Sequence, residues 1–313
     1  MKLVVTIPAY NEQRTIANVI KEIPTSIEGI DSVEVMVIDD GSIDNTVGDA
    51  IKAGAGEVVT HIVNKGLGVT FRDGLDSALG RGADIIVNID ADGQYNATQI
   101  SALIKPILDK KADIVLGWRD IDHLDFMPRA KKLGNKLATW TTKRLAGLPI
   151  KDAQTGFRAF SREAALRINL FGKYTHVQET LIQASHKGLQ IEQVPVEFRR
   201  RDGKSRLIPN LSTYAIRAGT LILSTYRDYH PLKFFSSLGG IFLVIGLSFG
   251  VKVLLHFSQT GMVSPYLPSA ILASLLILIG LGTITLGIFT HMLNSQRQLS
   301  EEILYRLKKS EKS

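Results

Sequence analysis

The chain has 313 residues, of which 45% are hydrophobic and 21% charged, and this composition excludes an intrinsically disordered protein. A formal net charge of +7 suits an anionic partner, such as a phosphate-bearing ligand or an anionic membrane face, and does not indicate nucleic acid. There is no cysteine, which excludes disulfides, thiolate zinc sites and a cysteine nucleophile.

The apolar run at the N-terminus ends at Pro8 and is too short for a signal peptide, so we expect the first domain to stay on the cytoplasmic side. After this run, short β-rich segments alternate with helical patterns. Strands are predicted at residues 3–7, 33–38, 57–62, 85–89 and 114–116, and helices at residues 15–23, 45–53, 69–79 and 98–110. This alternation predicts an α/β fold with a mostly parallel sheet covered on both faces, in which ligands bind beyond the carboxyl ends of the strands.

Four predicted strands are followed by polar or glycine-rich residues. These segments are Pro-Ala-Tyr-Asn-Glu at 8–12, Asp-Asp-Gly-Ser at 39–42, Asn-Lys-Gly-Leu-Gly at 64–68 and Asp-Ala-Asp-Gly-Gln at 90–94. Turns favour such residues in any protein, but four such segments at one edge of a sheet indicate one shared pocket.

Two carboxylates, Asp90 and Asp92, follow the fourth predicted strand. Both side chains can reach one hard divalent cation, and Mg²⁺ or Mn²⁺ prefers oxygen ligands while keeping positions open for substrate phosphates. Gln94 is placed to add a carbonyl oxygen or to orient a water molecule. The alternative is a turn and N-cap pair for the following helix. For the second pair, Asp39 and Asp40, we expect hydrogen bonding to a nucleobase or ribose, with a second metal site as the alternative.

In this ordered set of motifs the chain resembles the family 2 glycosyltransferases, which have a GT-A fold and bind nucleotide sugars. Segments 8–12 and 39–42 are similar to the family's nucleoside-binding signatures, and Asp90-Ala91-Asp92 is similar to its metal-binding DxD motif. The resemblance covers about residues 2–210 and implies a nucleotide-sugar site made of Pro8, Tyr10, Glu12, Asp39, Asp40, Lys65, Asp90, Ala91 and Arg119. The Gln-x-x-Arg-Trp signature of the processive polysaccharide synthases is absent.

The segment Asp-Ala-Gln-Thr-Gly-Phe-Arg at 152–158 resembles the family's acceptor-side segment. Asp152 is the first candidate for positioning at the reacting centre, and Glu179 is the second. With the apolar C-terminal segments, the resemblance narrows to the dolichyl- and polyprenyl-phosphate hexose synthases. A lipid phosphate needs no strong general base, because the second pKa of a phosphate is about 6.

Basic residues gather around residue 129 and between residues 199 and 206. Arginine binds phosphate through two parallel hydrogen bonds, so these clusters are expected to bind donor or acceptor phosphate. The residues expected to do so are Arg129, Arg201, Ser205 and Arg206. The alternative is a basic patch that is attracted to anionic lipid.

Two segments, 234–257 and 267–290, are apolar and long enough to cross the ~30 Å hydrocarbon core of a bilayer. The alternative is a pair of buried core helices. The connector at 258–266 has no lysine or arginine, whereas both outer flanks have several, so the positive-inside rule places both termini in the cytoplasm. Residues 211–229 mix apolar and charged side chains, which predicts an amphipathic helix in the membrane interface or a surface helix of the soluble domain.

We therefore expect a cytoplasmic GT-A domain at 1–207, an interfacial amphipathic helix at 208–231, two transmembrane helices at 232–292 and a charged cytoplasmic tail at 293–313. The expected activity is inverting, Mg²⁺- or Mn²⁺-dependent transfer of a hexose from GDP-mannose or UDP-glucose to a polyprenyl or dolichyl phosphate. We expect a multi-pass protein of the cell membrane rather than the endoplasmic reticulum, able to form a homo-oligomer. Two alternatives are a glycosyltransferase with another lipid hydroxyl as acceptor, and a non-catalytic scaffold that binds nucleotide sugar.

Overall fold

The computed structural model describes residues 1–170, 176–200, 226–227 and 230–311. The chain divides into two compact units, one made of residues 1–215 and 303–313, and the other of residues 216–302. Most of the amphipathic helix expected at 208–231 lies outside the described residues, as do Arg201, Ser205 and Arg206.

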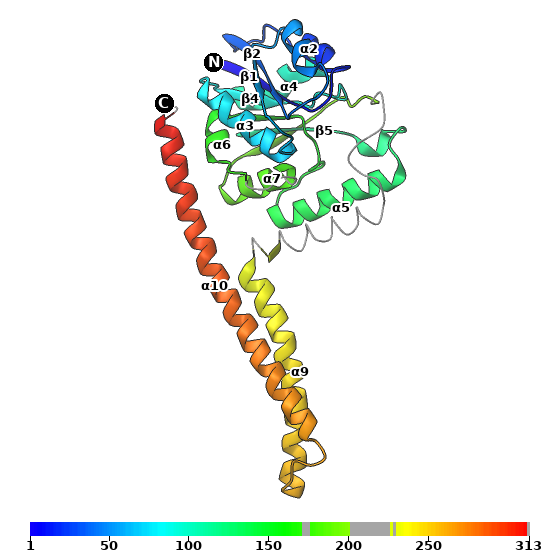
Figure 1. The fold of residues 1–313 in the computed structure, drawn as a ribbon, viewed down its shortest axis with the longest axis vertical. Helices are drawn as coiled ribbons and strands as arrows, with labels where there is room; N and C mark the ends of the chain where they lie inside the picture. Colours follow the sequence, from blue (N-terminus) through cyan, green and yellow to red (C-terminus); the bar gives the residue numbers. More distant parts are fainter. Residues whose placement is uncertain (171–175, 201–225, 228–229, 312–313) are drawn as a thin grey trace. The chain divides into compact units, whose positions relative to one another are not determined.

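The first unit is built on a seven-stranded sheet with helices on both of its faces (Figure 1). Its strands are β1 (Lys2–Ala9), β2 (Ser32–Asp39), β3 (Glu57–Thr60), β4 (Ile85–Asn88), β5 (Ile114–Trp118), β6 (Arg158–Ser161) and β7 (Ile191–Pro195). Its helices are α1 (Ile16–Glu22), α2 (Thr46–Ala53), α3 (Leu67–Gly80), α4 (Ile100–Leu108), α5 (Arg129–Ala146), α6 (Arg162–Arg167) and α7 (His176–His186), with short 3₁₀ turns at Ala97–Gln99 and Ile121–His123.

The strands run in the spatial order β3-β2-β1-β4-β6-β5-β7. All neighbouring pairs are parallel except those of β6, which is antiparallel to both β4 and β5. The predicted α/β class and mostly parallel sheet are therefore confirmed. β6 and β7 were not among the predicted strands, and β3 ends at Thr60, two residues earlier than predicted.

Each face of the sheet has its own apolar core. On one face, Leu3, Val5 and Ile7 of β1 pack with residues of α1, α2 and α4. On the other face, Val4 of β1 packs with residues of α3, α6 and α7. Successive side chains of a strand point to opposite faces, so a strand buried on both faces reads as one continuous apolar run. This explains why β1 is recognisable in the sequence.

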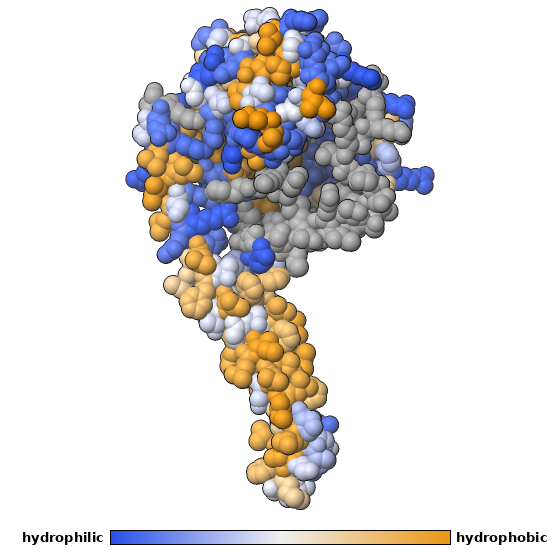
Figure 2. All heavy atoms as spheres, viewed as in Figure 1, coloured by the Kyte–Doolittle hydropathy of each residue, from blue (hydrophilic) through white to orange (hydrophobic). Residues whose placement is uncertain are grey.

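The second unit contains the helices that correspond to the two predicted spans, α9 (Pro231–Thr260) and most of α10 (Leu267–Glu311). Their most apolar windows have mean hydropathies of 2.2 and 2.4, and only 11% and 17% of these windows is buried. A core helix of a soluble protein would be mostly buried, whereas here apolar side chains cover the outside of the helices (Figure 2). The two helices therefore fit membrane association.

The buried residues between the two helices are spaced seven apart, and all but Val253 are glycine or alanine. They are Gly239, Gly246 and Val253 on α9 and Ala273, Gly280 and Gly287 on α10. A Cβ atom added at Gly239 would lie 2.6 Å from the carbonyl oxygen of Gly280, and one at Gly280 would lie 2.9 Å from that of Gly239. Real Cβ atoms do not approach so closely, so glycine is required at both positions for this backbone separation.

The segment expected as a separate tail continues α10 as a helix, and its last residues belong to the first unit. The hydroxyl of Tyr305 donates to Glu163 Oε1 on α6 at 2.9 Å, and the guanidinium of Arg167 lies 5.1 Å from the centre of the Tyr305 ring. Lys308 Nζ lies 2.9 Å from Asp76 Oδ1 on α3. The chain thus leaves the first unit near residue 215 and re-enters it at residue 303.

Candidate active site

The carboxyl ends of β1, β2 and β4 bring together three of the segments predicted to share a pocket. β1 pairs with β2 on one side and with β4 on the other, so the strand order reverses at β1 and β4. Ligands of open α/β sheets bind in the crevice outside such a switch point. Asn11, after β1, receives a hydrogen bond from the backbone of Ile43 and donates its own N–H to Ser42 Oγ, both at 2.8 Å. The first two predicted segments are therefore in direct contact.

Asp39 ends β2 and is completely buried. Its Oδ2 accepts a hydrogen bond from the backbone N–H of Ser42 at 3.1 Å, while its Oδ1 is buried without a hydrogen-bond partner among the described residues. A buried carboxylate oxygen without a donor is costly, because it has lost its water and gained nothing in return. A ligand N–H or hydroxyl group would supply the missing donor, which suits the predicted nucleoside contact.

Asp40, the neighbouring carboxylate, holds the loop after β3. Its two oxygens accept hydrogen bonds from the backbone N–H groups of Lys65 and Gly66 at 2.8 and 2.9 Å. Gly66 has a φ of 93°, which favours glycine, and it precedes the first residue of α3. The structure therefore gives Asp40 the task of fixing the backbone of the loop that carries Lys65, whose side chain is exposed.

His61, which no sequence motif singled out, contacts Asp40 and supports it. It is buried, with Nδ1 2.8 Å from Asp40 Oδ1 and Nε2 3.1 Å from Asp73 Oδ2 on α3. Both ring nitrogens thus face carboxylate oxygens. In the sequence, His61 directly follows the end of β3 and looks like an ordinary polar loop residue. Its role becomes visible only from its contact with Asp40 in the structure.

Asp90 and Asp92 follow β4 and are both half-buried. Asp92 Oδ1 accepts a hydrogen bond from the backbone N–H of Gln94 at 3.1 Å. A Cβ atom added at Gly156 would lie 2.5 Å from Asp90 Oδ2, so the absence of a side chain at Gly156 leaves room for this carboxylate. Among the described residues no group of three or more His, Cys, Asp or Glu side chains is placed to hold a metal. Two carboxylates alone suit a hard cation that takes its remaining ligands from phosphates.

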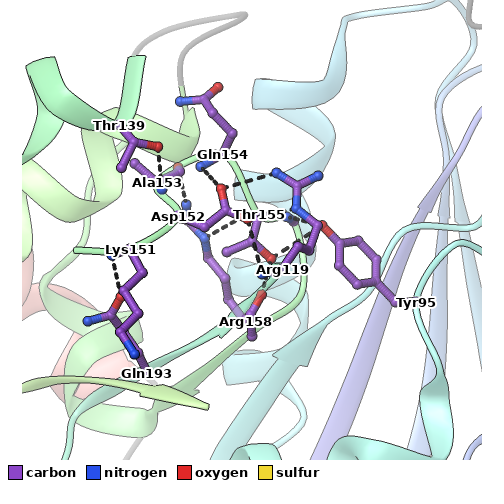
Figure 3. Close-up of polar contacts among 12 residues, drawn as sticks. Tyr95, Arg119, Thr139, Lys151, Asp152, Ala153, Gln154, Thr155, Arg158 and Gln193 are labelled. Carbon is purple, nitrogen blue, oxygen red and sulfur yellow. Dashed lines mark hydrogen bonds and ion pairs between the residues drawn. The ribbon is translucent and has the colours of Figure 1, made fainter. Parts of the chain in front are cut away.

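Asp152 and Arg119 form a buried ion pair. Asp152 is fully buried and Arg119 is 8% exposed. Arg119 Nε donates to Asp152 Oδ2 at 2.7 Å and Nη2 donates to Oδ1 at 3.1 Å, which makes the contact bidentate (Figure 3). The predicted catalytic candidate and a predicted donor-binding residue therefore lie together, and the carboxylate orients the guanidinium.

Aromatic rings complete the surroundings of Arg119. Its guanidinium lies 4.9 Å from the centre of the Phe198 ring, which in turn packs edge-on against Tyr95 with centroids 5.0 Å apart. Burial raises the pKa of Tyr95 to about 12. Burial by itself opposes the charge of Arg119, but Tyr95, Asp152 and Asp90 raise its pKa above the usual value, so this guanidinium stays protonated.

The loop between Asp152 and β6 is held from inside by Arg158. This arginine is fully buried and donates to the backbone carbonyls of Ala153 and Thr155 at 3.0 and 2.9 Å (Figure 3). It also donates to the carbonyl of Val177 at 2.8 Å. Burial lowers the pKa of Arg158 to about 10. Tyr95 also contributes, since its hydroxyl oxygen accepts a hydrogen bond from the backbone N–H of Gly156 at 3.0 Å. Arg158 therefore shapes the loop that presents Asp152.

The other predicted site residues occupy varied positions. Pro8 and Ala91 are buried, Tyr10 is 39% exposed, and Glu12 donates its backbone N–H to Thr46 Oγ1 at 2.9 Å. The side-chain amide of Gln94 donates to the carbonyl of Arg199 at 3.2 Å, so it links the turn after β4 to the segment after β7.

Two further predicted residues are carried by helices. Glu179 is half-buried in the first turn of α7, where its Oε1 accepts a hydrogen bond from Gln183 at 3.2 Å. Arg129 is exposed at the start of α5.

Four supporting residues of this site were not predicted from the sequence, namely Tyr95, Phe198, Arg158 and His61. Tyr95 directly follows the recognised segment 90–94, and Arg158 is the last residue of the recognised segment 152–158, so their place in the sequence was a usable signal. Phe198 precedes a basic run and gave no signal, because its partners are distant in sequence. Tyr95 meets it through an isolated β-bridge, and Arg119 meets it through the pairing of β5 with β7.

Comparisons with known proteins identify a matching family model and several relatives of this chain. The family model described as Glycosyl transferase family 2 matches residues 4–168, from β1 to just beyond α6. The UDP-N-acetylglucosamine–dolichyl-phosphate N-acetylglucosaminyltransferase of Methanococcus voltae is 33% identical over 247 residues, which cover 72% of this chain and 92% of the relative. The polyprenol monophosphomannose synthase of Mycolicibacterium smegmatis is 28% identical over 212 residues, covering 64% and 78%.

A solved structure has the same fold. Glucosyl-3-phosphoglycerate synthase from Mycobacterium tuberculosis, crystallised with Mn²⁺, uridine diphosphate and phosphoglyceric acid, superimposes with a TM-score of 0.55 at 25% identity. The match covers 73% of this chain and 78% of that chain. The GT-A fold expected from the resemblance is thereby confirmed.

Proposed function

The chain belongs to glycosyl transferase family 2, and we propose that it transfers a hexose from a nucleotide diphosphate sugar to a polyprenyl or dolichyl phosphate. One observation carries the proposal. The acidic pair Asp90 and Asp92 and the buried cation of Arg119 meet at one segment. A Cβ atom added at Gly156 would lie 2.5 Å from Asp90 Oδ2, and Asp152, four residues before Gly156, holds the guanidinium of Arg119. In such a site the two carboxylates would hold a metal ion beside the diphosphate, and the guanidinium of Arg119 would bind a phosphate group.

The nucleoside part of the donor is proposed to bind between the ends of β1 and β2. The unpaired Oδ1 of Asp39 would accept a hydrogen bond from the base or ribose. Pro8, Tyr10 and Glu12 line the same end of β1, and Asp40 fixes the loop that carries Lys65. These roles are supported by the order of the strands and by the directions of the hydrogen bonds.

Asp90 and Asp92 are the proposed ligands of Mg²⁺ or Mn²⁺, with Gln94 beside them. Their oxygen donors fit either ion, and the relative crystallised with uridine diphosphate contains Mn²⁺. A divalent ion bound there supplies Lewis-acid stabilisation of the charge that develops on the leaving diphosphate. Gly156 leaves the Asp90 carboxylate the space it needs, and Ala91 between the two acids is buried as part of the turn.

The acceptor is proposed to be a lipid phosphate, in keeping with the names of both relatives and with two helices that fit membrane association. A phosphate oxygen attacks the anomeric carbon on the face opposite the nucleoside diphosphate, forms the new carbon–oxygen bond, and inverts the anomeric centre as the diphosphate leaves. No proton must be removed from the nucleophile, because the phosphate is largely dianionic above its second pKa of about 6. Arg129, Arg201, Ser205 and Arg206 are proposed to hold this phosphate. Arg119 is proposed to bind a phosphate of the donor, as the resemblance implies, with Asp152 as its positioning residue.

The acceptor alternative, a lipid hydroxyl, requires a general base within reach. Asp152 is an unsuitable base, because both of its oxygens already accept hydrogen bonds from Arg119. Glu179 remains the candidate base for that alternative. A pH–rate profile distinguishes the two acceptors, since a hydroxyl acceptor would require Glu179 and a phosphate acceptor would not.

The proposed placement in the membrane follows the charges that flank the spans. Arg227 and Lys233 precede or begin α9, and Arg297, Arg306, Lys308 and Lys309 lie in the last third of α10, whereas the connector at 258–266 has no lysine or arginine. Both ends of the spanning pair would then face the cytoplasm, together with the first unit. We place the protein in the cell membrane.

The decisive experiment incubates membranes that contain the full chain with polyprenyl phosphate, Mn²⁺ and a panel of radiolabelled nucleotide sugars. Because the two relatives are named for N-acetylglucosamine and mannose, the panel includes UDP-N-acetylglucosamine, UDP-glucose and GDP-mannose. Label should pass into an acid-labile, organic-soluble product with one of these donors. Asp92→Ala should abolish the transfer and its metal dependence while leaving the protein folded. Binding of donor without any lipid-linked product would instead favour the scaffold alternative.

A further inference from the structure

The outward face of α5 is apolar along its centre. Leu133, Leu137 and Trp140 are 70%, 46% and 58% exposed, and their spacing of four and three residues puts them on one stripe of the helix. The opposite side of α5 is buried, with Gly134, Asn135, Thr139, Thr141 and Thr142 turned into the protein. The helix is therefore firmly packed on one side and presents three large apolar side chains on the other.

Charge on α5 has one sign. The helix contains six basic residues and no acidic residue, namely Arg129, Lys131, Lys132, Lys136, Lys143 and Arg144. Helix stability does not explain this distribution, since cations in the first turn oppose the helix dipole and only those in the last turn complement it. Lys136 and Lys132 also contact Asp122 in the preceding loop, so Lys143 and Arg144 are the clearest flanking charges of the stripe.

We propose that this face of α5 lies in the headgroup region of an anionic lipid bilayer. Large apolar side chains with a tryptophan at the centre, bordered by lysine and arginine, are what a helix needs to rest in the membrane interface. Lysine and arginine can extend toward lipid phosphates while their methylene groups cover the apolar stripe. The chain also carries its own apolar helices, so a bilayer that holds them is tethered to the unit that contains α5.

A protein partner fits this face less well. Three exposed apolar side chains on one helix fall short of the roughly 800 Å² that each side of a standard protein interface buries. A bilayer has no such requirement, because it supplies both the apolar phase and the anionic charge. The inference goes beyond the transfer reaction, since it concerns which surface of the first unit touches lipid and holds for any sugar or acceptor.

The test uses nitroxide labels on single cysteines, which the cysteine-free chain makes straightforward. Leu137→Cys places the label on the proposed face. Ile51→Cys is the matched control, an apolar residue on α2 that is 58% exposed. The full-length proteins are reconstituted into vesicles of equal parts phosphatidylcholine and phosphatidylglycerol, and the accessibility of each label to oxygen and to a water-soluble nickel chelate is measured by electron paramagnetic resonance.

The label at position 137 should be more accessible to oxygen than to nickel, because oxygen concentrates in lipid, and the label at position 51 should show the reverse. Equal behaviour of the two labels would overturn the proposal. A label at 137 that is shielded from both reagents would also overturn it, because that result means that protein covers the face. The double substitution K143Q/R144Q should reduce the oxygen preference at 137, and it should do so more in vesicles with phosphatidylglycerol than in pure phosphatidylcholine.

Tryptophan fluorescence gives a second measurement that needs no label. Lipids brominated in their acyl chains should quench the unmodified protein more than Trp140→Phe, whose remaining tryptophan, Trp118, belongs to strand β5. Equal quenching of the two proteins would show that Trp140 does not reach the lipid and would also overturn the proposal.

Discussion

At the scale of single residues, the site depends on one buried cation and the carboxylate that holds it. Arg119 is fixed by two hydrogen bonds from its guanidinium to Asp152 and by the face of Phe198. Burying an ion pair costs desolvation on both sides, so such a pair is weak evidence of a stabilising role. The ion pair instead fixes the orientation of Arg119. A guanidinium held on two sides presents its remaining N–H groups in a fixed direction.

Substitutions at this pair should separate stability from activity. Asp152→Asn leaves Arg119 buried without a countercharge, and breaking such a pair typically costs about 3–5 kcal/mol. The double variant R119M/D152N removes both charges and should recover most of the unfolding temperature, yet it should remain inactive because the phosphate contact is gone. Thermal unfolding in detergent and lipid-linked product formation are the two measurements. Recovery of activity in the double variant would show that Arg119 serves only the fold.

Asp39 allows a direct test of the nucleoside site. In Asp39→Asn, the amide oxygen would face the Ser42 N–H and its NH₂ group would take the place of the unpaired Oδ1. A ligand donor would then meet another donor. Hydrogen bonds to charged groups are worth about 1.5–3 kcal/mol, so nucleoside diphosphate affinity should fall about 10- to 100-fold by calorimetry. Asp49→Asn on α2, which makes the same chemical change away from the site, should bind as the unmodified protein does.

At the scale of elements, the central strands were predictable and the edge of the sheet was not. β1, β2 and β4 are apolar runs followed by polar turns, and the parallel arrangement places those turns at one edge. β6 has four residues, begins with the buried Arg158 and is antiparallel to both neighbours. Neither its length nor its hydrophobic pattern predicts a strand. β7 has a mixed burial pattern and becomes a strand only by pairing with β5.

The site could be predicted where its residues are close in the sequence. Asp90 and Asp92 were recognisable as a pair, because two residues on one turn lie close together in space. Contacts between distant segments were not, which is why the partnership of Arg119 with Asp152 and the support of Asp40 by His61 emerged only from the structure.

The paired helices of the second unit yield a matched test of close packing. Gly280→Ala would put a methyl group 2.8 Å from Leu243 Cγ and 2.9 Å from the carbonyl oxygen of Gly239, whereas Gly282→Ala would meet nothing within 4 Å. Both changes make the same gain in helix propensity, so their difference isolates the clash. Overpacking costs about 1–3 kcal/mol, and only Gly280→Ala should lower the thermal unfolding temperature in detergent. Equal effects of the two substitutions would mean that the helices are not packed through Gly280.

At the scale of the whole molecule, the chain connects its two units twice. It passes from the first unit to the second near residue 215 and returns through α10 at residue 303. The second connection was not predictable from the sequence, because the charged segment after the second apolar span is equally typical of a solvated tail. What distinguishes it is the pairing of Tyr305 and Lys308 with Glu163 and Asp76, which lie more than a hundred residues away in the chain.

This return contact should protect the first unit from local opening. Tyr305→Ala removes the hydrogen bond to Glu163 and the ring beneath Arg167, so the backbone amides of α6 should exchange with deuterium more rapidly. A hydrogen bond to a charged group contributes about 1.5 kcal/mol or more, which corresponds to about a tenfold rise in the opening equilibrium. Leu307→Ala is the matched control, because Leu307 is two residues further along α10 and 53% exposed. If α6 exchanged equally in both variants, the contact of Tyr305 with α6 would not stabilise the first unit in solution.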